Sequence, residues 1–262
     1  MHDQDETVLA GGNLSHVVKV GNTVRRPAGS WTPMVHRLLV HVRSRGFHLG
    51  PVPHGLDEKG REVLSFIAGE TLTKDPWPQW VWSDTLLLEA ARSLAAYHEA
   101  VGDFRPAVVE SRLGAAQLRD DEIVCHNDFS PYNSVFRDGH LVGIIDWDIV
   151  CPRRPSWDLA FVAWHWVPLH APSPDLAWRP PIECGRRLRM LADAYGLNEK
   201  RPGLVHEVIA RIKASRTGII ERARSGDEAF ARLEREGHAD EMGRAIAFVR
   251  SIEGLLQGAL VN

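Results

Sequence analysis

The chain has 262 residues, 44% of them hydrophobic and 25% charged, so it can bury a sizeable core in one large domain or two lobes. A formal net charge of −3 argues against a strongly basic nucleic-acid-binding surface. The three cysteines lack metal-ligand spacing, the first residues are polar and acidic, and no apolar run reaches the ~20 residues of a membrane span. We therefore expect a cytoplasmic protein with no nucleic-acid or membrane partner.

The sequence pattern of residues 1–68 predicts a small β-rich lobe. Short segments rich in β-branched residues are separated by Gly-Asn turns, which is typical of antiparallel hairpins. Thr32-Pro33 is typical of a helix start, and apolar residues recur at helical spacing from there to Gly46. A further strand is expected at 62–67.

The sequence pattern of residues 69–262 predicts a larger, mainly helical lobe. A helix capped by Ser83 or Asp84 is followed by a polar loop and by a strand at 141–145. From Pro155 onward every strong pattern has helical periodicity. The fold class is therefore α+β with two lobes, and the expected helices of the second lobe are 84–102, 157–166, 183–195, 204–224 and 240–259.

The segment from His126 to Asn133 carries the strongest functional pattern. Asp128 and Asn133 lie five residues apart, and Asp146 follows thirteen residues after Asn133, at the end of the apolar strand 141–145. Protein kinases use an Asp near the attacking hydroxyl, then an Asn and a later strand-end Asp that bind Mg²⁺. A polar turn is the structural alternative. The strand-end Asp favours a kinase, with Asp128 as the catalytic base and Asn133 and Asp146 as magnesium ligands.

Three neighbouring side chains have structural or open roles. His126 is expected to pack and hydrogen-bond beneath the loop, because no second His or Cys lies at zinc-ligand spacing. Asp148 is equally consistent with a contact to metal or water and with a solvent-facing position. Asp158, near the start of a predicted helix, is expected to accept hydrogen bonds from backbone amides and to steady the catalytic loop.

The turn that contains Gly11, Gly12, Asn13 and Ser15 is the predicted cover of the nucleotide phosphates. Glycines let backbone N–H groups approach phosphate oxygens closely. Any β-hairpin can also use a Gly-Gly-Asn turn, so the prediction depends on the position of the turn ahead of two strands.

The remaining nucleotide contacts are expected on the third strand and at the hinge. Arg25 is the predicted phosphate-binding cation, with Arg26 on the opposite face of the strand as the alternative. A solvated surface cation is the structural alternative for Arg25. The hinge is expected near residues 65–70, where backbone groups of Ser65 and Ile67 would contact the adenine edge.

The chain resembles the aminoglycoside phosphotransferase and choline-kinase-like family along nearly its whole length. The resemblance implies a bilobal protein-kinase-like fold, with a nucleotide-binding lobe at 1–68 and a catalytic, substrate-binding lobe at 69–262. It also implies ATP or GTP with Mg²⁺, and transfer of the γ-phosphate to a hydroxyl of a small metabolite or antibiotic. The residues that carry it are Gly11-Gly12-Asn13, the segment 63–71 ending in Gly69-Glu70-Thr71, the loop 126–133, Ile145-Asp146-Trp147-Asp148 and Trp157-Asp158-Leu159-Ala160.

Two departures from the family pattern concern the nucleotide site. Arg25 stands where a lysine is common, and the first helix offers no Glu around Val35-His36-Arg37 to pair with that cation. The missing ion pair leaves a nucleotide-binding pseudokinase with a regulatory role as one alternative.

The acceptor is open on sequence grounds. Residues 183–262 contain twelve Asp and Glu against fourteen Lys and Arg, a balance that does not indicate a site for a polycation. The acceptor is therefore not assigned to the aminoglycosides, and a strict aminoglycoside O-phosphotransferase is one alternative. An amino alcohol, a sugar, a nucleoside-like compound or another antibiotic would fit equally well.

Overall fold

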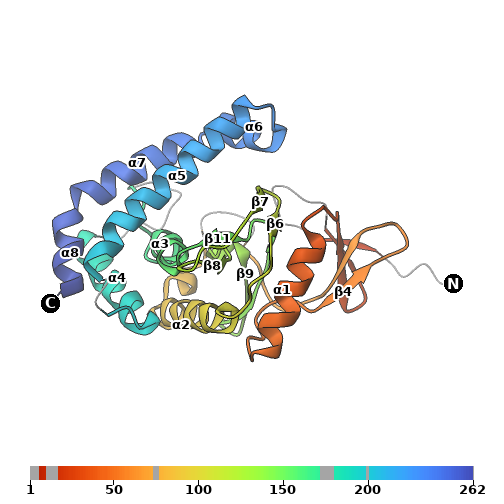
Figure 1. The fold of residues 1–262 in the computed structure, drawn as a ribbon. Coiled ribbons are helices and arrows are strands. Elements are labelled where there is room, and N and C mark those ends of the chain that lie inside the picture. The colour runs from red at the N-terminus through yellow and green to blue at the C-terminus, as the bar shows by residue number, and fades with distance from the viewer. Residues whose placement is uncertain (1–5, 10–16, 73–76, 172–179, 199–200, 262) are drawn as a thin grey trace. The chain divides into compact units, whose positions relative to one another are not determined.

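The computed structural model describes residues 6–9, 17–72, 77–171, 180–198 and 201–261. The chain divides into two compact units: a first unit of residues 1–74 and 93–158, and a second unit of residues 75–92 and 159–262. Figure 1 shows the strands concentrated in the red-to-green part of the chain and a series of helices in the blue part. The boundary proposed after residue 68 lies inside the first unit and stays a prediction.

The first unit opens with an antiparallel five-stranded sheet in the order β1-β2-β3-β5-β4. In the pairing of β3 with β5, Arg26 lies directly opposite Glu62 and Arg25 opposite Val63. Successive residues of a strand point to opposite faces, so Arg26 and Glu62 share one face and Arg25 lies on the other. The strands are β1 (Thr7–Val8), β2 (Val18–Val20), β3 (Thr23–Arg26), β4 (Pro53–Leu56) and β5 (Glu62–Ser65).

Helix α1 (Thr32–Ser44) lies beside β4 and β6. Its apolar residues recur at helical spacing, which gives the helix one buried stripe. Gly46 follows the helix with φ +90°, a conformation that suits glycine at a helix end. The buried stripe consists of Met34, Val35, Leu38, Leu39 and Val42.

Three short antiparallel strand pairs, two of them hairpins, also belong to the first unit. The β9–β10 hairpin turns at Asp138-Gly139, where both residues have positive φ, as a type I′ turn requires. Gly69 lies so close to β9 that a Cβ atom there would be 2.4 Å from the carbonyl oxygen of Phe136, and Glu70 pairs with Phe136. The hairpins are β6 (Val109–Ser111) with β7 (Gly114–Ala116) and β9 (Ser134–Arg137) with β10 (His140–Ile144). The third pair is β8 (Ile123–Cys125) with β11 (Cys151–Arg153), two strands that β9 and β10 separate in the sequence.

The second unit is helical. Helix α5 packs against α6 and α7, and α4 packs against α8. Buried Arg187 donates hydrogen bonds to the carbonyl oxygens of Trp82 and Trp166 and pairs with Asp84, so its charge has polar partners. The helices are α4 (Pro181–Tyr195), α5 (Leu204–Arg224), α6 (Glu228–Arg235), α7 (His238–Ser251) and α8 (Glu253–Val261), and α2 (Asp84–Val101) and α3 (Pro155–Trp166) each have residues in both units.

The helix predictions agree with the structure to within a few residues, with two differences. The helix expected at 240–259 is two helices that meet at Ile252, and the short helix α6 was not predicted. Asp227 caps α6 by accepting hydrogen bonds from the backbone N–H groups of Ala229 and Phe230. Across the residues described, no helix is both long enough and apolar enough to cross a membrane.

Candidate active site

The predicted catalytic loop follows the buried strand β8 and brings Asp128 and Asn133 together. A single 3₁₀ turn, η2 (Pro131–Asn133), carries the chain back toward Asp128. Nδ2 of Asn133 then donates hydrogen bonds to Oδ2 of Asp128 at 2.7 Å and to its carbonyl oxygen at 2.9 Å. The five-residue spacing therefore makes a closed loop in which the amide group of Asn133 fixes the orientation of the Asp128 carboxylate.

Asp146 joins this loop through backbone pairing. The N–H of Ile145 donates to the carbonyl oxygen of Asn133 at 2.9 Å, so Asp146 comes directly after the residue that contacts the loop. Asp146 has φ +62°, in the left-handed region, which turns the chain away from strand β10. Reduced hydration raises the pKa of Asp146, and the nearby Asp148 adds to this effect. Because 49% of its side chain is exposed, the carboxylate is accessible to a cation.

His126 is a buried support of the loop, as predicted. Its Nδ1 accepts a hydrogen bond from the backbone N–H of Asp128 at 3.2 Å, and Nε2 lies 3.2 Å from the carbonyl oxygen of Ile145. This pattern corresponds to a neutral ring that donates from Nε2. Burial lowers the pKa of His126 to about 4, which keeps the ring neutral near pH 7.

Asp158 anchors the backbone of the loop, which confirms its predicted role. Its two carboxylate oxygens accept hydrogen bonds from the backbone N–H groups of His126 and Asn127, both at 2.8 Å. Nε2 of His98 lies 3.2 Å from Oδ2. Burial would raise the pKa of Asp158, but the hydrogen bonds that it accepts from His98 and from the backbone N–H of His126 outweigh burial, so the pKa is lowered. The carboxylate is therefore an ionised anchor for the loop.

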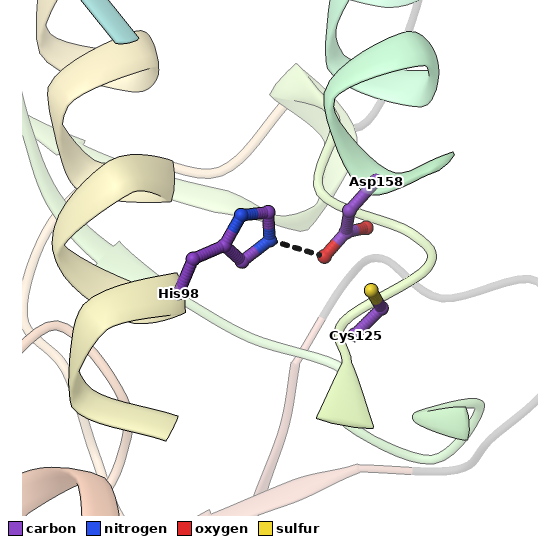
Figure 2. Close-up of side chains that lie close together, drawn as sticks. All are labelled: His98, Cys125 and Asp158. Atoms are coloured by element: carbon purple, nitrogen blue, oxygen red, sulfur yellow. Dashed lines mark hydrogen bonds and ion pairs between the residues drawn. The ribbon is translucent and has the colours of Figure 1, made fainter. Parts of the chain in front are cut away.

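Figure 2 shows His98 of α2 pointing at Asp158, with Cys125 at the end of β8 beside them. The potential ligand atoms of the three buried residues all lie within 4.8 Å of one another, a spacing compatible with a metal ion. Both oxygens of Asp158, however, already accept backbone hydrogen bonds. Support of the loop at residues 126–133 therefore explains this cluster without a metal.

The cation that reaches Asp146 is Arg26. Nη1 of Arg26 lies 3.5 Å from Asp146, Nη2 lies 2.6 Å from Asp148, and Nε pairs with Glu62. Burial would lower the pKa of Arg26, but these carboxylates outweigh it and the pKa is raised. Arg25 instead donates to Thr23 Oγ1 at 2.5 Å and lies 3.6 Å from Asp57, so the structure does not bring it to Asp146.

The donor atoms at this site fit a magnesium ion. One guanidinium, that of Arg26, faces three carboxylates, those of Glu62, Asp146 and Asp148, so this cluster has an excess of negative charge. Mg²⁺ prefers oxygen ligands, and Asn133 and Asp146 offer an amide and a carboxylate oxygen. Asp148, whose role the sequence left open, is buried and paired with Arg26.

The other predicted nucleotide contacts are only partly described. Gly11, Gly12, Asn13 and Ser15 lie outside the described residues. The backbone N–H of Ser65 donates to Val52, and its hydroxyl accepts from the backbone N–H of Val52. The side chain of Ile67 packs against Gly143, where a Cβ atom would lie 2.8 Å from it. The roles of Ser65 and Ile67 at the adenine stay predictions.

Sequence comparisons relate this chain to known proteins. The profile of the "Phosphotransferase enzyme family" matches residues 105–179. The trifolitoxin immunity protein of Rhizobium leguminosarum bv. trifolii is 34% identical over an alignment 215 residues long, which covers 78% of this chain and 80% of that protein. The chain belongs to the phosphotransferase enzyme family.

Solved structures show which fold the chain has. Choline kinase from Cryptosporidium parvum Iowa II is similar with a TM-score of 0.60 at 10% identity, over 98% of this chain and 91% of that one. An aminoglycoside 2′-phosphotransferase, solved as its GDP complex, gives a TM-score of 0.55 at 13% identity, over 96% and 93%. The predicted α+β, protein-kinase-like fold is confirmed.

Glu62 and His98 are the site residues of this phosphotransferase that sequence reasoning missed. Glu62 is a strand residue directly opposite Arg26, and cross-strand pairing of opposite charges is the pattern that would have found it. His98 lies on the apolar face of the helix predicted at 84–102, where a buried histidine needs a polar partner. That partner, Asp158, lies 60 residues away in the sequence.

Proposed function

We propose that this phosphotransferase family member is a kinase that transfers the γ-phosphate of ATP or GTP to a hydroxyl group of a small molecule. The proposal rests on one observation above all. Asn133 donates a hydrogen bond to Asp128 and accepts one from Ile145, the residue before Asp146, and Arg26 lies 3.5 Å from Asp146. This is the set of groups that phosphoryl transfer requires, namely a base, oxygen ligands for Mg²⁺ and a cation for phosphate.

Asp128 is the proposed catalytic base. Its carboxylate orients the acceptor hydroxyl and takes the proton as the phosphoryl group is transferred. The hydrogen bond from Asn133 holds the carboxylate, and Asp158 holds the backbone on which it stands. Asn133 and Asp146 would hold Mg²⁺, which neutralises charge on the phosphates when it is bound.

Arg26 is the proposed phosphate-binding cation, in preference to Arg25. A guanidinium can donate two parallel hydrogen bonds to a phosphate, so an arginine can act where related kinases keep a lysine. Arg26 lies 3.5 Å from Asp146, whereas Arg25 is on the opposite face of β3, paired with Asp57. The glycine-rich turn at Gly11-Gly12-Asn13 and Ser15 remains the proposed cover of the phosphates.

An antibacterial compound is the acceptor class that the relatives favour. The 34% identical relative is named as an immunity protein against trifolitoxin, and phosphorylation of a hydroxyl is one way to inactivate a toxin. A metabolite such as an amino alcohol is the second candidate, because a choline kinase shares the fold. A strict aminoglycoside phosphotransferase is the third, supported by the structural likeness to an aminoglycoside 2′-phosphotransferase.

Thermal unfolding with ATP or GTP, each with Mg²⁺, tests the nucleotide site. A ligand that binds only the folded state at a hundred times its Kd stabilises it by about 2.7 kcal/mol. We expect a metal-dependent rise in Tm for the wild type that is reduced in Asp146→Ala. No shift at millimolar ATP or GTP would refute the active-kinase proposal. A positive result leads to a screen of hydroxylated antibiotics, amino alcohols and sugars, with Asp128→Ala as the inactive control.

A further inference from the structure

Partly buried His36 and buried Glu62 form a chain of contacts that ends at Arg26. We propose that Glu62 and His36 are positioning residues that aim Arg26 at the nucleotide phosphates. Together they replace the glutamate that the first helix of this family would be expected to supply. This inference rests on the proposed kinase function.

The pair of Arg26 with Glu62 follows from the register of the sheet. The two residues lie directly opposite each other on β3 and β5, and Nε of Arg26 pairs with Oε2 of Glu62. Glu62 is 1% exposed and Arg26 is 8% exposed. A buried carboxylate is costly unless it is paired and hydrogen-bonded, so its presence beside the apolar residues Val63 and Leu64 indicates a specific role.

His36 holds the other oxygen of this carboxylate. Its Nε2 lies 2.9 Å from Oε1 of Glu62, and the residue comes from α1, the helix that lacks a glutamate. With Oε2 on Arg26 and Oε1 on His36, the carboxylate is contacted on both sides. The helix therefore still contributes to the ion pair, but as a donor to a carboxylate supplied by the neighbouring strand.

The guanidinium of Arg26 is fixed by three different carboxylates. Nε faces Glu62, Nη2 faces Asp148 at 2.6 Å, and Nη1 faces Asp146 at 3.5 Å. The contact of Nη1 is the longest of the three. Nη1, which faces the proposed metal ligand Asp146, is therefore the guanidinium nitrogen with the weakest partner. Glu62 thus holds Nε of Arg26 and leaves Nη1 available to a phosphate oxygen.

A purely electrostatic role of Glu62 and a positioning role predict opposite effects of Glu62→Gln on nucleotide affinity. By Coulomb's law alone, removal of a negative charge near the site strengthens the binding of an anionic nucleotide. Loss of a positioning contact weakens it, because Nε of Arg26 then has no carboxylate to hold the guanidinium in this orientation. We expect a loss of about tenfold in affinity for Mg²⁺-ATP, the equivalent of one charge-assisted hydrogen bond.

Isothermal calorimetry with Mg²⁺-ATP tests this on the full chain with wild type, Glu62→Gln, Arg26→Gln and the double variant. If Glu62 acts through Arg26, the double variant binds no more weakly than Arg26→Gln alone. His36→Gln, whose amide can still donate to Glu62, should stay within about threefold of wild type, and His36→Leu should bind more weakly than that. Asp57→Asn removes the charge of a carboxylate that lies beside Arg25, directly after β4, and this matched control should bind as wild type.

The outcomes separate this inference from the proposed function. If the wild type binds neither ATP nor GTP, the kinase proposal fails and this inference fails with it. If the wild type binds and a folded Glu62→Gln binds equally or more tightly, only the positioning role is refuted. If Glu62→Gln does not fold, the comparison of His36→Leu with His36→Gln decides, and equal affinities of these two variants refute the role of the chain of contacts.

Discussion

Nδ2 of Asn133 lies 2.7 Å from Oδ2 of Asp128, so the proposed base and one proposed metal ligand form a single hydrogen-bonded pair. Asn133 uses its amide nitrogen for this contact, and its amide oxygen is the atom suited to a cation. The two residues should nevertheless be separable by experiment, because only Asp128 is proposed to accept a proton.

Asp128→Asn should abolish transfer and spare nucleotide binding. An amide cannot accept the proton of the acceptor hydroxyl, and loss of a general base typically lowers kcat by about 10²- to 10⁴-fold. Affinity for Mg²⁺-ATP should stay within about threefold, since Asp128 is not a proposed ligand of metal or nucleotide. Asp138→Asn makes the same change at the exposed β9–β10 turn and should leave kcat unchanged. A kcat within tenfold of wild type in Asp128→Asn would rule out Asp128 as the base.

Asn133→Ala should raise the Mg²⁺ requirement as well as lower the rate. The substitution removes an oxygen ligand, so the Mg²⁺ concentration for half-maximal nucleotide binding should rise by about tenfold, the equivalent of about 1.4 kcal/mol. A titration of Mg²⁺ at fixed ATP, followed by thermal shift, measures this change. Asn198→Ala, at an exposed position of the second unit, is the control. An unchanged Mg²⁺ requirement would confine Asn133 to the orientation of Asp128.

The sequence predicted the centre of this site better than its surroundings. The spacing of Asp128, Asn133 and Asp146 depends on one local loop and one hairpin, so linear order was enough to bring the residues together. The choice between Arg25 and Arg26 depends on which face of β3 is covered, which requires the pairing partner of the strand. Period-2 alternation gives two faces but cannot say which one the helix covers.

Longer-range contacts were beyond the reach of sequence patterns. The missing glutamate on the first helix suggested a degenerate site. The carboxylate that pairs with Arg26 comes instead from Glu62 on β5, which lies 26 residues after His36. Local propensity carries no information about such a pair. The helix boundaries, by contrast, depend on local periodicity and caps, and were predicted within a few residues except where the chain breaks at Ile252.

Asp158→Asn should destabilise the protein strongly. The carboxylate is fully buried and accepts hydrogen bonds from two backbone N–H groups, so an amide would place its own N–H against one of these donors. Loss of a buried, hydrogen-bonded charge costs about 3 kcal/mol or more. Urea unfolding measures it. Asp193→Asn, an exposed helix residue paired with Arg201, should change stability by about 1 kcal/mol at most. Equal effects of the two substitutions would contradict the anchoring role of Asp158.

His126 should make the fold less stable as the pH falls below about 6.5. Burial lowers the pKa of His126 to about 4, whereas a histidine in an unfolded chain titrates near 6.5. Between these values the unfolded chain binds a proton that the folded protein does not. The unfolding free energy therefore decreases as the pH falls, by up to about 1.4 kcal/mol per pH unit from this residue.

Urea unfolding of wild type and His126→Gln at pH 5, 6, 7 and 8 isolates that contribution. Burial also lowers the pKa values of His165, to about 3, and His170, to about 4, so the variant should keep a pH dependence, but a shallower one than wild type. The comparison is best made above pH 5, where the lowered pKa of Asp158 keeps its carboxylate ionised in both proteins. His48→Gln, at an exposed position outside the loop, should reproduce the wild-type profile. Identical slopes in wild type and His126→Gln would mean that the ring takes up its proton in the folded protein, and His126 would then be no neutral support of the loop.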